Sequence, residues 1–346
     1  MEAETLSETS AGPTACTYLL TIRRVRFDDR VAKDFRDYFR LLTAARCEVL
    51  VIDGSPPDVF AAHEEAWRGA CRHAAVDARY AYLNGKVNGI HTGVALAAHE
   101  RIILADDDIR YTPPDVRRMT ELLAAHDMVR PQNYLCPLPV WARTEAARML
   151  INRGWMAEGD YPGTLGVRRD AMLRVGHYDG DVLFDNEEIV RHFRTRGANI
   201  RYARDFFILK RPPGFRKWIE QRPRQAYEDF VMRAKTAFFA ALPFALVFAW
   251  LAGGWRPALA LAAFVACGAV LLAARGLGDG ASRFFPFRLC AYAPLWVVER
   301  TASTYWAFYW RAVRGGYPFG DKLLSKGTGR AWNVAGRAAP NSSSEQ

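Results

Sequence analysis

Short apolar runs alternate with longer helical stretches through the first 210 residues of the chain. The runs predict six strands, at residues 18–25, 48–53, 79–82, 101–105, 128–131 and 163–167. Apolar residues at helical spacing predict helices between them, near residues 30–44, 57–77, 86–98, 113–126 and 143–153. Because this alternation is typical of α/β proteins, we expect a mostly parallel sheet with helices on both faces.

Two segments without a charged side chain follow, at residues 236–254 and 257–274. Each approaches the roughly 20 residues with which a helix crosses about 30 Å of hydrocarbon. Only Trp255 and Arg256 separate them, so the pattern predicts a membrane hairpin at residues 236–275. Two buried helices of a soluble core are the alternative, but core helices usually carry a polar stripe and these segments have none.

A third apolar stretch, at residues 284–312, is rich in aromatic residues but contains Arg288, Glu299 and Arg300. A membrane crossing here would place Glu299 and Arg300 in hydrocarbon, at a cost of several kcal/mol. An interfacial helix with its Trp and Tyr side chains at headgroup depth is therefore favoured over a third transmembrane helix.

Charge is distributed unevenly along the 346 residues. Residues 1–200 hold 26 basic and 29 acidic side chains, whereas residues 201–235 hold 10 basic and 4 acidic ones, within a total net charge of +10. A nucleic-acid-binding protein would be more evenly basic, so no nucleic-acid partner is expected. A basic segment next to apolar helices instead indicates an anionic membrane surface and membrane lipid as a partner.

The basic residues also predict an orientation. Seven of them flank the hairpin on its two outer sides, against a single Arg256 in its turn: Arg222, Arg224, Arg233, Lys235, Arg275, Arg283 and Arg288. The positive-inside rule therefore predicts a multi-pass protein of an inner or plasma membrane with both ends, and the α/β domain, in the cytoplasm. Residues 1–15 lack the apolar stretch of a signal peptide and are expected to be a disordered tail. Residues 313–346 are expected to form a cytoplasmic tail.

The six cysteines are widely scattered and include no C-x-x-C pair. Their spacing indicates neither a zinc site nor a disulfide framework, and reduced thiols are expected.

Acidic residues follow two of the predicted strands, where ligands of such sheets bind. The second strand ends at Asp53, and the fourth leads into Asp106, Asp107 and Asp108. Side chains alternate along an extended chain, so Asp106 and Asp108 can face one side and hold Mg²⁺ or Mn²⁺ against a diphosphate. A solvated acidic turn that caps the next helix is the alternative.

Two helix starts carry further candidate residues. Lys86 opens the helix that leads to the acidic cluster, where its charge suits a phosphate, although a surface lysine beside a Gly-rich turn explains it equally well. Asp185, Glu187 and Glu188 crowd the start of a helix at residues 184–197. Helix capping explains the two glutamates as well as a catalytic role does, whereas Asp185, at the junction of loop and helix, can act as a general base toward an acceptor hydroxyl.

The basic segment at residues 211–230 combines aromatic, amide and guanidinium groups that suit a sugar and a diphosphate. These groups belong to Trp218, Gln221, Arg222, Arg224 and Gln225. A juxtamembrane stretch that only touches lipid is the alternative, and the two roles are compatible.

In this order and spacing, the motifs VIDGSP, NGKVNGIHTGVALAAHERIILADDD, GTLGVRRDAMLRVGHYD and QRPRQ resemble the membrane-bound branch of glycosyltransferase family 2. This branch contains cellulose-synthase-like and ceramide-glucosyltransferase-like enzymes, and the resemblance covers residues 16–330. It implies a GT-A catalytic domain at residues 16–210 and a juxtamembrane segment with the QRPRQ motif at residues 211–235.

The resemblance also implies roles for individual residues. Donor contacts map to Asp53, Lys86, Asp106, Gln221, Arg222, Arg224 and Gln225, and metal ligands to Asp106 and Asp108. The acceptor side maps to Gly163, Thr164 and Trp218. The family's usual Glu-Asp pair reads Asp185-Asn186 here, and an amide cannot accept a proton, so the base is assigned to Asp185, with Glu188 and then Glu187 as alternatives.

The implied function is metal-dependent, inverting transfer of a sugar from a nucleotide-diphosphate donor to a lipid-linked or polysaccharide acceptor hydroxyl at the cytoplasmic membrane face. Gln225 replaces the motif's usual Trp, which argues against a processive polymer channel, as do only two predicted spans. A catalytically inactive nucleotide-binding scaffold and a membrane-tethered nucleotidyltransferase are the alternatives. The scaffold is suggested by Asn186, which stands where the family has its base. A nucleotidyltransferase would need a Gly/Arg/Lys-rich first strand-turn for the triphosphate, and residues 21–29 contain no glycine.

Overall fold

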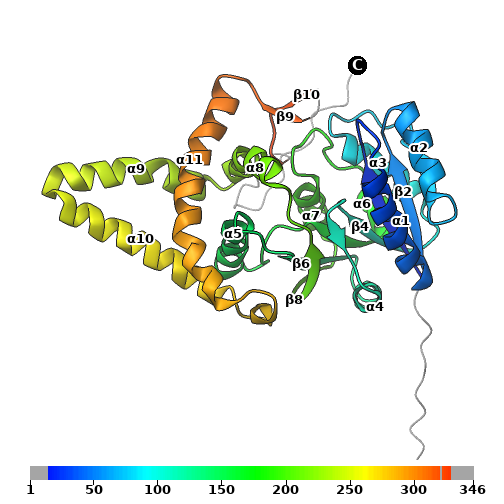
Figure 1. Ribbon diagram of the computed structural model, residues 1–346, viewed down its shortest axis with the longest axis horizontal. Helices are drawn as coiled ribbons and strands as arrows, with labels where there is room; N and C mark the ends of the chain where they lie inside the picture. Colours follow the sequence, from blue (N-terminus) through cyan, green and yellow to red (C-terminus); the bar gives the residue numbers. More distant parts are fainter. Residues whose placement is uncertain (1–14, 320–321, 329–346) are drawn as a thin grey trace, which may run out of the picture.

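The computed structural model describes residues 15–319 and 322–328 (Figure 1). Most of the predicted N-terminal tail and residues 329–346 of the predicted C-terminal tail therefore lie outside the described residues. An eight-stranded sheet dominates the first 210 residues, in the order β3-β2-β1-β4-β7-β6-β8-β5. Its strands are β1 (Cys16–Ile22), β2 (Cys47–Asp53), β3 (Arg72–Ala75), β4 (Arg101–Ala105), β5 (Ile109–Arg110), β6 (Met128–Leu135), β7 (Thr164–Arg168) and β8 (Ile200–Lys210).

The predicted α/β class is confirmed, because the sheet is mostly parallel and helices cover both faces. Parallel pairs join β1 to β2, β1 to β4, β2 to β3 and β6 to β8, while β7 and β5 pair antiparallel. The helices of this region are α1 (Asp29–Ala44), α2 (Pro57–Trp67), α3 (Gly85–Leu96), α4 (Pro113–Leu122), α5 (Ala142–Trp155), α6 (Arg169–Val175) and α7 (Asp185–Thr195).

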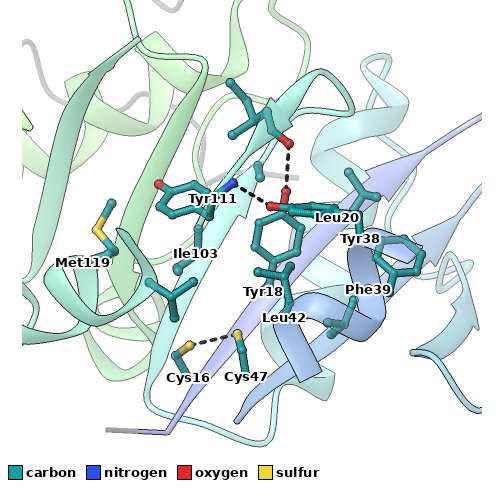
Figure 2. Close-up of a cluster of buried hydrophobic side chains, with 14 of the residues drawn as sticks. Cys16, Tyr18, Leu20, Tyr38, Phe39, Leu42, Cys47, Ile103, Tyr111 and Met119 are labelled. Atoms are coloured by element: carbon teal, nitrogen blue, oxygen red, sulfur yellow. Dashed lines mark hydrogen bonds between the residues drawn. The ribbon is translucent and has the colours of Figure 1, made fainter. Parts of the chain in front are cut away.

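Successive side chains of a strand point to opposite faces of the sheet, so the strand residues show which helices cover each face. Tyr18 and Leu20 of β1 pack with α1, α2 and α4, whereas Leu19 packs with α3, α6 and α7. Figure 2 shows the first face, where Tyr38 from α1 and Met119 from α4 close over the sheet and the Tyr38 hydroxyl accepts a bond from the Tyr111 backbone N–H, 2.7 Å away. Cys16 and Cys47 lie opposite each other at the starts of β1 and β2, with their Sγ atoms 2.9 Å apart.

Two predicted elements are wrong. Residues 79–82 form no strand, because both backbone groups of Tyr82 bond to the side chain of Asn88 rather than to a neighbouring strand. The helix predicted at residues 57–77 ends at Trp67, before Gly69 adopts a φ of +73°, and the strand β3 follows. Strand β8 was not predicted, because charged residues interrupt its apolar pattern.

The region at residues 215–312 is largely helical. It comprises α8 (Phe215–Glu228), the short 3₁₀ helix η1 (Asp229–Val231), α9 (Arg233–Gly253), α10 (Trp255–Arg275), the 3₁₀ helices η2 (Ala281–Arg283) and η3 (Phe287–Tyr292), and α11 (Ala293–Ala312). The two uncharged segments form α9 and α10, which turn at Gly254, whose φ of +74° suits glycine. Figure 1 shows this hairpin projecting away from the sheet.

Only 6% and 11% of the most apolar windows of α9 and α10 are buried inside the protein. Among the described residues these are the two helices long and apolar enough to cross a membrane. They are therefore not buried core helices of the described chain. The predicted helical hairpin is confirmed.

The base of the hairpin is packed tightly onto the α/β part. Gly154 of α5 lies so close to α10 that a Cβ there would be 2.0 Å from the Leu272 carbonyl oxygen. The fully buried Arg153 donates hydrogen bonds to the carbonyl oxygens of Gly276 and Gly278, each at 3.0 Å. This contact fixes the hairpin relative to the sheet and, with it, the cavity that lies between them.

Candidate active site

A cavity of about 680 Å³ lies between the ends of the strands and the helices α5, α8, α9 and α11. Its sheet end is lined by Lys86, Asp106, Asp107, Asp108 and Asp185. Its helix end is lined by Glu145, Arg148, Glu228, Asp229, Lys235 and Arg300. The residues named for the sheet end lie between positions 86 and 185 and those for the helix end between positions 145 and 300, so only the folded chain brings them together.

The sheet end is organised around Lys86. Asn84 caps α3, since its side chain accepts a hydrogen bond from the Lys86 backbone N–H at 3.0 Å. The Lys86 ammonium group forms an ion pair with Asp106 and a second one with Asp185, whose Oδ2 is 2.7 Å from Nζ. Although burial opposes its charge, these two carboxylates raise the pKa of Lys86 above its usual value. A permanently charged lysine therefore joins the predicted metal ligand to the predicted base.

The acidic cluster does not adopt the predicted extended form. Asp107 and Asp108 form a turn between β4 and β5, and all three carboxylates line the cavity. Asp107 pairs with Arg24 at 2.5 Å, and Lys210 lies 3.5 Å from Oδ2 of Asp108. Oδ1 of Asp108 is buried without a hydrogen-bond partner in the described chain.

The surroundings shift the pKa values of Asp106 and Asp108 in opposite directions. Burial raises the pKa of Asp108, and the charges of Asp106 and Asp107 add to this, although Lys210 opposes it. Burial also acts on Asp106, but the charges of Lys86 and Lys210 bring its pKa below the usual value. A cation bound by these carboxylates would offset the repulsion that raises the pKa of Asp108.

The three candidate bases lie in different places. Asp185 is the first residue of α7 and lines the cavity. Glu187 also lines the cavity, and its carboxylate pairs with Arg130 at 3.2 Å. Burial raises the pKa of Glu187. Glu188 is fully buried, pairs with Arg191 and does not line the cavity. Asn186 lies beside Asp185, and its Oδ1 accepts a hydrogen bond from Lys86 at 3.2 Å.

Asp53, the predicted nucleotide contact, is buried away from the cavity. His63 Nδ1 lies 2.7 Å and His73 Nε2 lies 3.2 Å from its Oδ2, and the Ser55 backbone N–H donates to Oδ1 at 2.8 Å. These contacts hold the end of β2, and the neighbouring Gly54 lines the cavity instead. Neither histidine was singled out in the sequence, because no spacing rule links them to Asp53.

Of the three predicted acceptor-side residues, two line the cavity and one does not. Gly163 and Trp218 line the cavity, whereas Thr164 is buried behind it and donates a hydrogen bond to the Leu104 carbonyl oxygen at 2.6 Å. The indole Nε1 of Trp218 is buried without a hydrogen-bond partner in the described part.

Four of the five residues of the QRPRQ motif reach the cavity from α8. Gln221, Arg222, Arg224 and Gln225 line it. Arg222 stacks on Trp218 at 4.7 Å and pairs with Glu145 at 2.6 Å, and Gln225 donates to the same carboxylate at 3.0 Å. Arg224 donates to the Leu183 carbonyl oxygen at 3.0 Å and has no carboxylate within 4.0 Å among the described residues.

One segment at this site was not predicted from the sequence. The predicted tail contains β9 (Tyr317–Phe319) and β10 (Lys322–Leu324), and the described residues after β10 return to the start of α7. The Phe184 backbone N–H donates to the Gly327 carbonyl oxygen at 3.0 Å, directly before Asp185. Phe319 and Lys322 line the cavity. No motif marks this contact, since it consists largely of backbone hydrogen bonds.

Comparison with known proteins gives distant similarities only. No family model and no curated protein matches the chain. A solved structure of the mannosyltransferase PcManGT from Pyrobaculum calidifontis, in complex with GDP-Man and Mn²⁺, is 16% identical, with a TM-score of 0.48, over 84% of this chain and 87% of that one.

A second solved structure is glucosyl-3-phosphoglycerate synthase from Mycobacterium tuberculosis, in complex with Mn²⁺, UDP and glucosyl-3-phosphoglycerate. It is 14% identical, with a TM-score of 0.38, over 58% of this chain and 71% of that one. These values do not assign the chain to a family.

Proposed function

We propose that this protein is a metal-dependent glycosyltransferase that moves a sugar from a nucleotide-diphosphate donor to an acceptor hydroxyl at a membrane surface. The observation that carries the proposal is the Lys86 bridge between Asp106 and Asp185 in the wall of one cavity. It joins a group suited to a diphosphate–metal complex to a carboxylate suited to an acceptor. The motif order of the membrane-bound family 2 branch supports the same assignment.

The residues present fit Mg²⁺ or Mn²⁺. Hard cations prefer oxygen ligands, and the buried Oδ1 of Asp108 lacks a hydrogen-bond partner in the described chain. Within residues 15–319 and 322–328, no group of three or more His, Cys, Asp or Glu side chains could hold a metal ion by itself. Asp106 and Asp108 would therefore hold the cation together with phosphate oxygens of the donor. When bound, the metal supplies positive charge for the departing nucleoside diphosphate.

Transfer requires one proton to leave the acceptor. The acceptor oxygen forms a bond to the anomeric carbon while that carbon's bond to the diphosphate oxygen breaks, and the diphosphate leaves with the electron pair. Asp185 accepts the hydroxyl proton, and Lys86 holds its carboxylate in place at 2.7 Å. Arg224, whose charge is unpaired in the described part, lies where it can contact the diphosphate.

The membrane part of the proposal rests on α9, α10 and α11. Five exposed apolar or aromatic side chains form a single stripe on α11, and Val313 directly after the helix continues it: Leu295, Val298, Tyr305, Trp306 and Tyr309. The opposite face buries Arg300, Ser303 and Thr304 in the protein. The charge of Arg300 is therefore kept from hydrocarbon, and α11 suits an interfacial helix beside a spanning hairpin.

A donor panel tests the proposed function. The purified full chain is incubated with nucleotide sugars and membrane lipid extract, with Mg²⁺, with Mn²⁺ or with chelator, and products are identified by mass. We expect transfer from at least one donor, loss of transfer with chelator, and a rate at least about a hundredfold lower in Asp108→Asn. The exposed Asp205→Asn serves as the matched control. Full activity of Asp108→Asn would contradict the metal assignment.

A further inference from the structure

Glu228 stands apart from the other acidic side chains of the cavity. Nine acidic residues line the cavity, and eight of them have a cationic nitrogen within 4.0 Å: Asp106, Asp107, Asp108, Glu145, Asp160, Asp185, Glu187 and Asp229. Glu228 has no ion pair or side-chain hydrogen bond among the described residues, although only 8% of the residue is exposed. Buried carboxyl groups are rarely left without a partner.

The groups around Glu228 explain how an unpaired acid is tolerated there. Burial and the charges of Glu187 on α7 and Asp229 on η1 raise its pKa to about 8, against smaller opposing effects of Arg148 on α5 and Lys235 on α9. Burial and the charges of Glu228, Asp229 and Glu187 likewise raise the pKa of Tyr161. At neutral pH the group is therefore mostly an uncharged carboxylic acid, which can both donate and accept a hydrogen bond.

The cationic side chains of the helix end already form ion pairs with carboxylates of the protein. Arg148 pairs with Glu145 and Asp160, while Lys235 and Arg300 both lie 2.9 Å from carboxylate oxygens of Asp229. A phosphate bound here would find no free positive charge among the described residues. Arg224 has no ion pair among the described residues; burial lowers its pKa, and the charges of Asp185, Glu228 and Asp106 oppose this shift, so Arg224 stands between the two ends.

The position of the helix end limits the occupant further. Lys235 is the third residue of α9, at the base of the apolar hairpin, and Arg300 belongs to the interfacial helix α11. A headgroup at this depth could enter while its chain stayed among the apolar side chains of these helices. An uncharged headgroup would leave the existing ion pairs intact.

We propose that the helix end is the acceptor subsite, and that the Glu228 carboxyl group orients an uncharged, hydroxyl-bearing lipid headgroup there by hydrogen bonding. This inference rests on the proposed function, whose donor site lies at the sheet end. Glu228 acts as a substrate-binding residue, and proton transfer remains with Asp185.

Binding of short-chain probes tests this subsite without catalysis. The full chain in lipid nanodiscs is titrated with octyl glucoside, 1-octanoylglycerol, octyl phosphate and octylamine, each below its micelle concentration and corrected with empty nanodiscs. We expect the sugar or the glycerol probe to bind tightest, with affinity falling about tenfold in Glu228→Ala and staying within about threefold in Glu228→Gln. Glu220→Gln, on the exposed part of α8, is the matched control.

The remaining outcomes separate the two proposals. Tightest binding of octyl phosphate or octylamine, or unchanged probe binding in Glu228→Ala, would overturn the acceptor assignment. UDP and GDP are titrated with Mn²⁺ on the same samples, and their unchanged affinity in the Glu228 variants shows that the variants fold. If neither nucleotide binds to the unmodified protein, the proposed function fails instead.

Discussion

The sheet end and the helix end of the cavity use charge in opposite ways. At the sheet end, Lys86 holds Asp106 and Asp185, and Oδ1 of Asp108 lacks a partner among the described residues. At the helix end, Lys235 and Arg300 are neutralised by Asp229, and the unpaired group is the acid Glu228. The first arrangement suits a charged ligand, and the second suits a ligand without charge. One cavity therefore offers two chemically different subsites.

The sheet end is tested most severely by removing its base. Asp185→Asn keeps the size of the side chain but cannot accept a proton, so we expect transfer to fall by about 10² to 10⁴-fold. Glu188→Gln is the matched comparison, because Glu188 belongs to the same helix but does not line the cavity. Rates are measured with saturating donor. An active Asp185→Asn with an inactive Glu188→Gln would move the base to Glu188.

The helix end is tested most severely at Asp229. Asp229→Asn leaves Lys235 and Arg300 buried without their carboxylate, and we expect a loss of about 3 to 5 kcal/mol in the free energy of unfolding. Thermal unfolding of the full chain, compared with the exposed Asp205→Asn, measures the effect. Unchanged stability would show that the two cations reach solvent or lipid instead.

The sequence predicted the sheet end better than the helix end, for a physical reason. Asp106, Asp108 and Lys86 follow strands or open helices, and the ends of neighbouring strands meet at one edge of a sheet. Local spacing therefore predicted their meeting. Glu145, Glu228 and Asp229 come together only because α5 packs against the helices after residue 211. Nothing local in the sequence encodes that packing.

The same limit applies to the predicted strands. Residues 101–105 form β4 as predicted, because the four residues after Arg101 are apolar and buried. Residues 79–82 have a similar composition, yet the Asn88 side chain takes up both backbone groups of Tyr82. Asp53 ends β2 as predicted, but two histidines from α2 and β3 enclose it. Side-chain partners on other elements decided both outcomes.

A smaller effect on stability is expected from Glu228. Its pKa is about 8 in the folded protein, above the ordinary 4.5, so the unmodified chain loses stability as the pH rises from about 4.5 through about 8. Glu228→Gln does not titrate, and we expect it to be more stable than the unmodified chain by on the order of 1 to 3 kcal/mol at pH 9 and equal to it near pH 4.5. Melting temperatures between pH 5 and pH 9 measure the difference. A difference that does not change with pH would show that Glu228 is ionised throughout.

The smallest effect concerns Arg224, which stands between the two ends. Its guanidinium group has no carboxylate within 4.0 Å in the described part, so its charge is available to a ligand. Arg224→Gln keeps a hydrogen-bond donor but removes the charge, and we expect UDP or GDP with Mn²⁺ to bind about tenfold more weakly. Octyl glucoside should bind equally well to both proteins, because an uncharged headgroup gains little from a cation. Raising the salt concentration should reduce the difference in nucleotide affinity, since the lost interaction is electrostatic. Equal losses for the nucleotide and the glucoside would mean that Arg224 supports the cavity as a whole, and the division into two subsites would then fail at this residue.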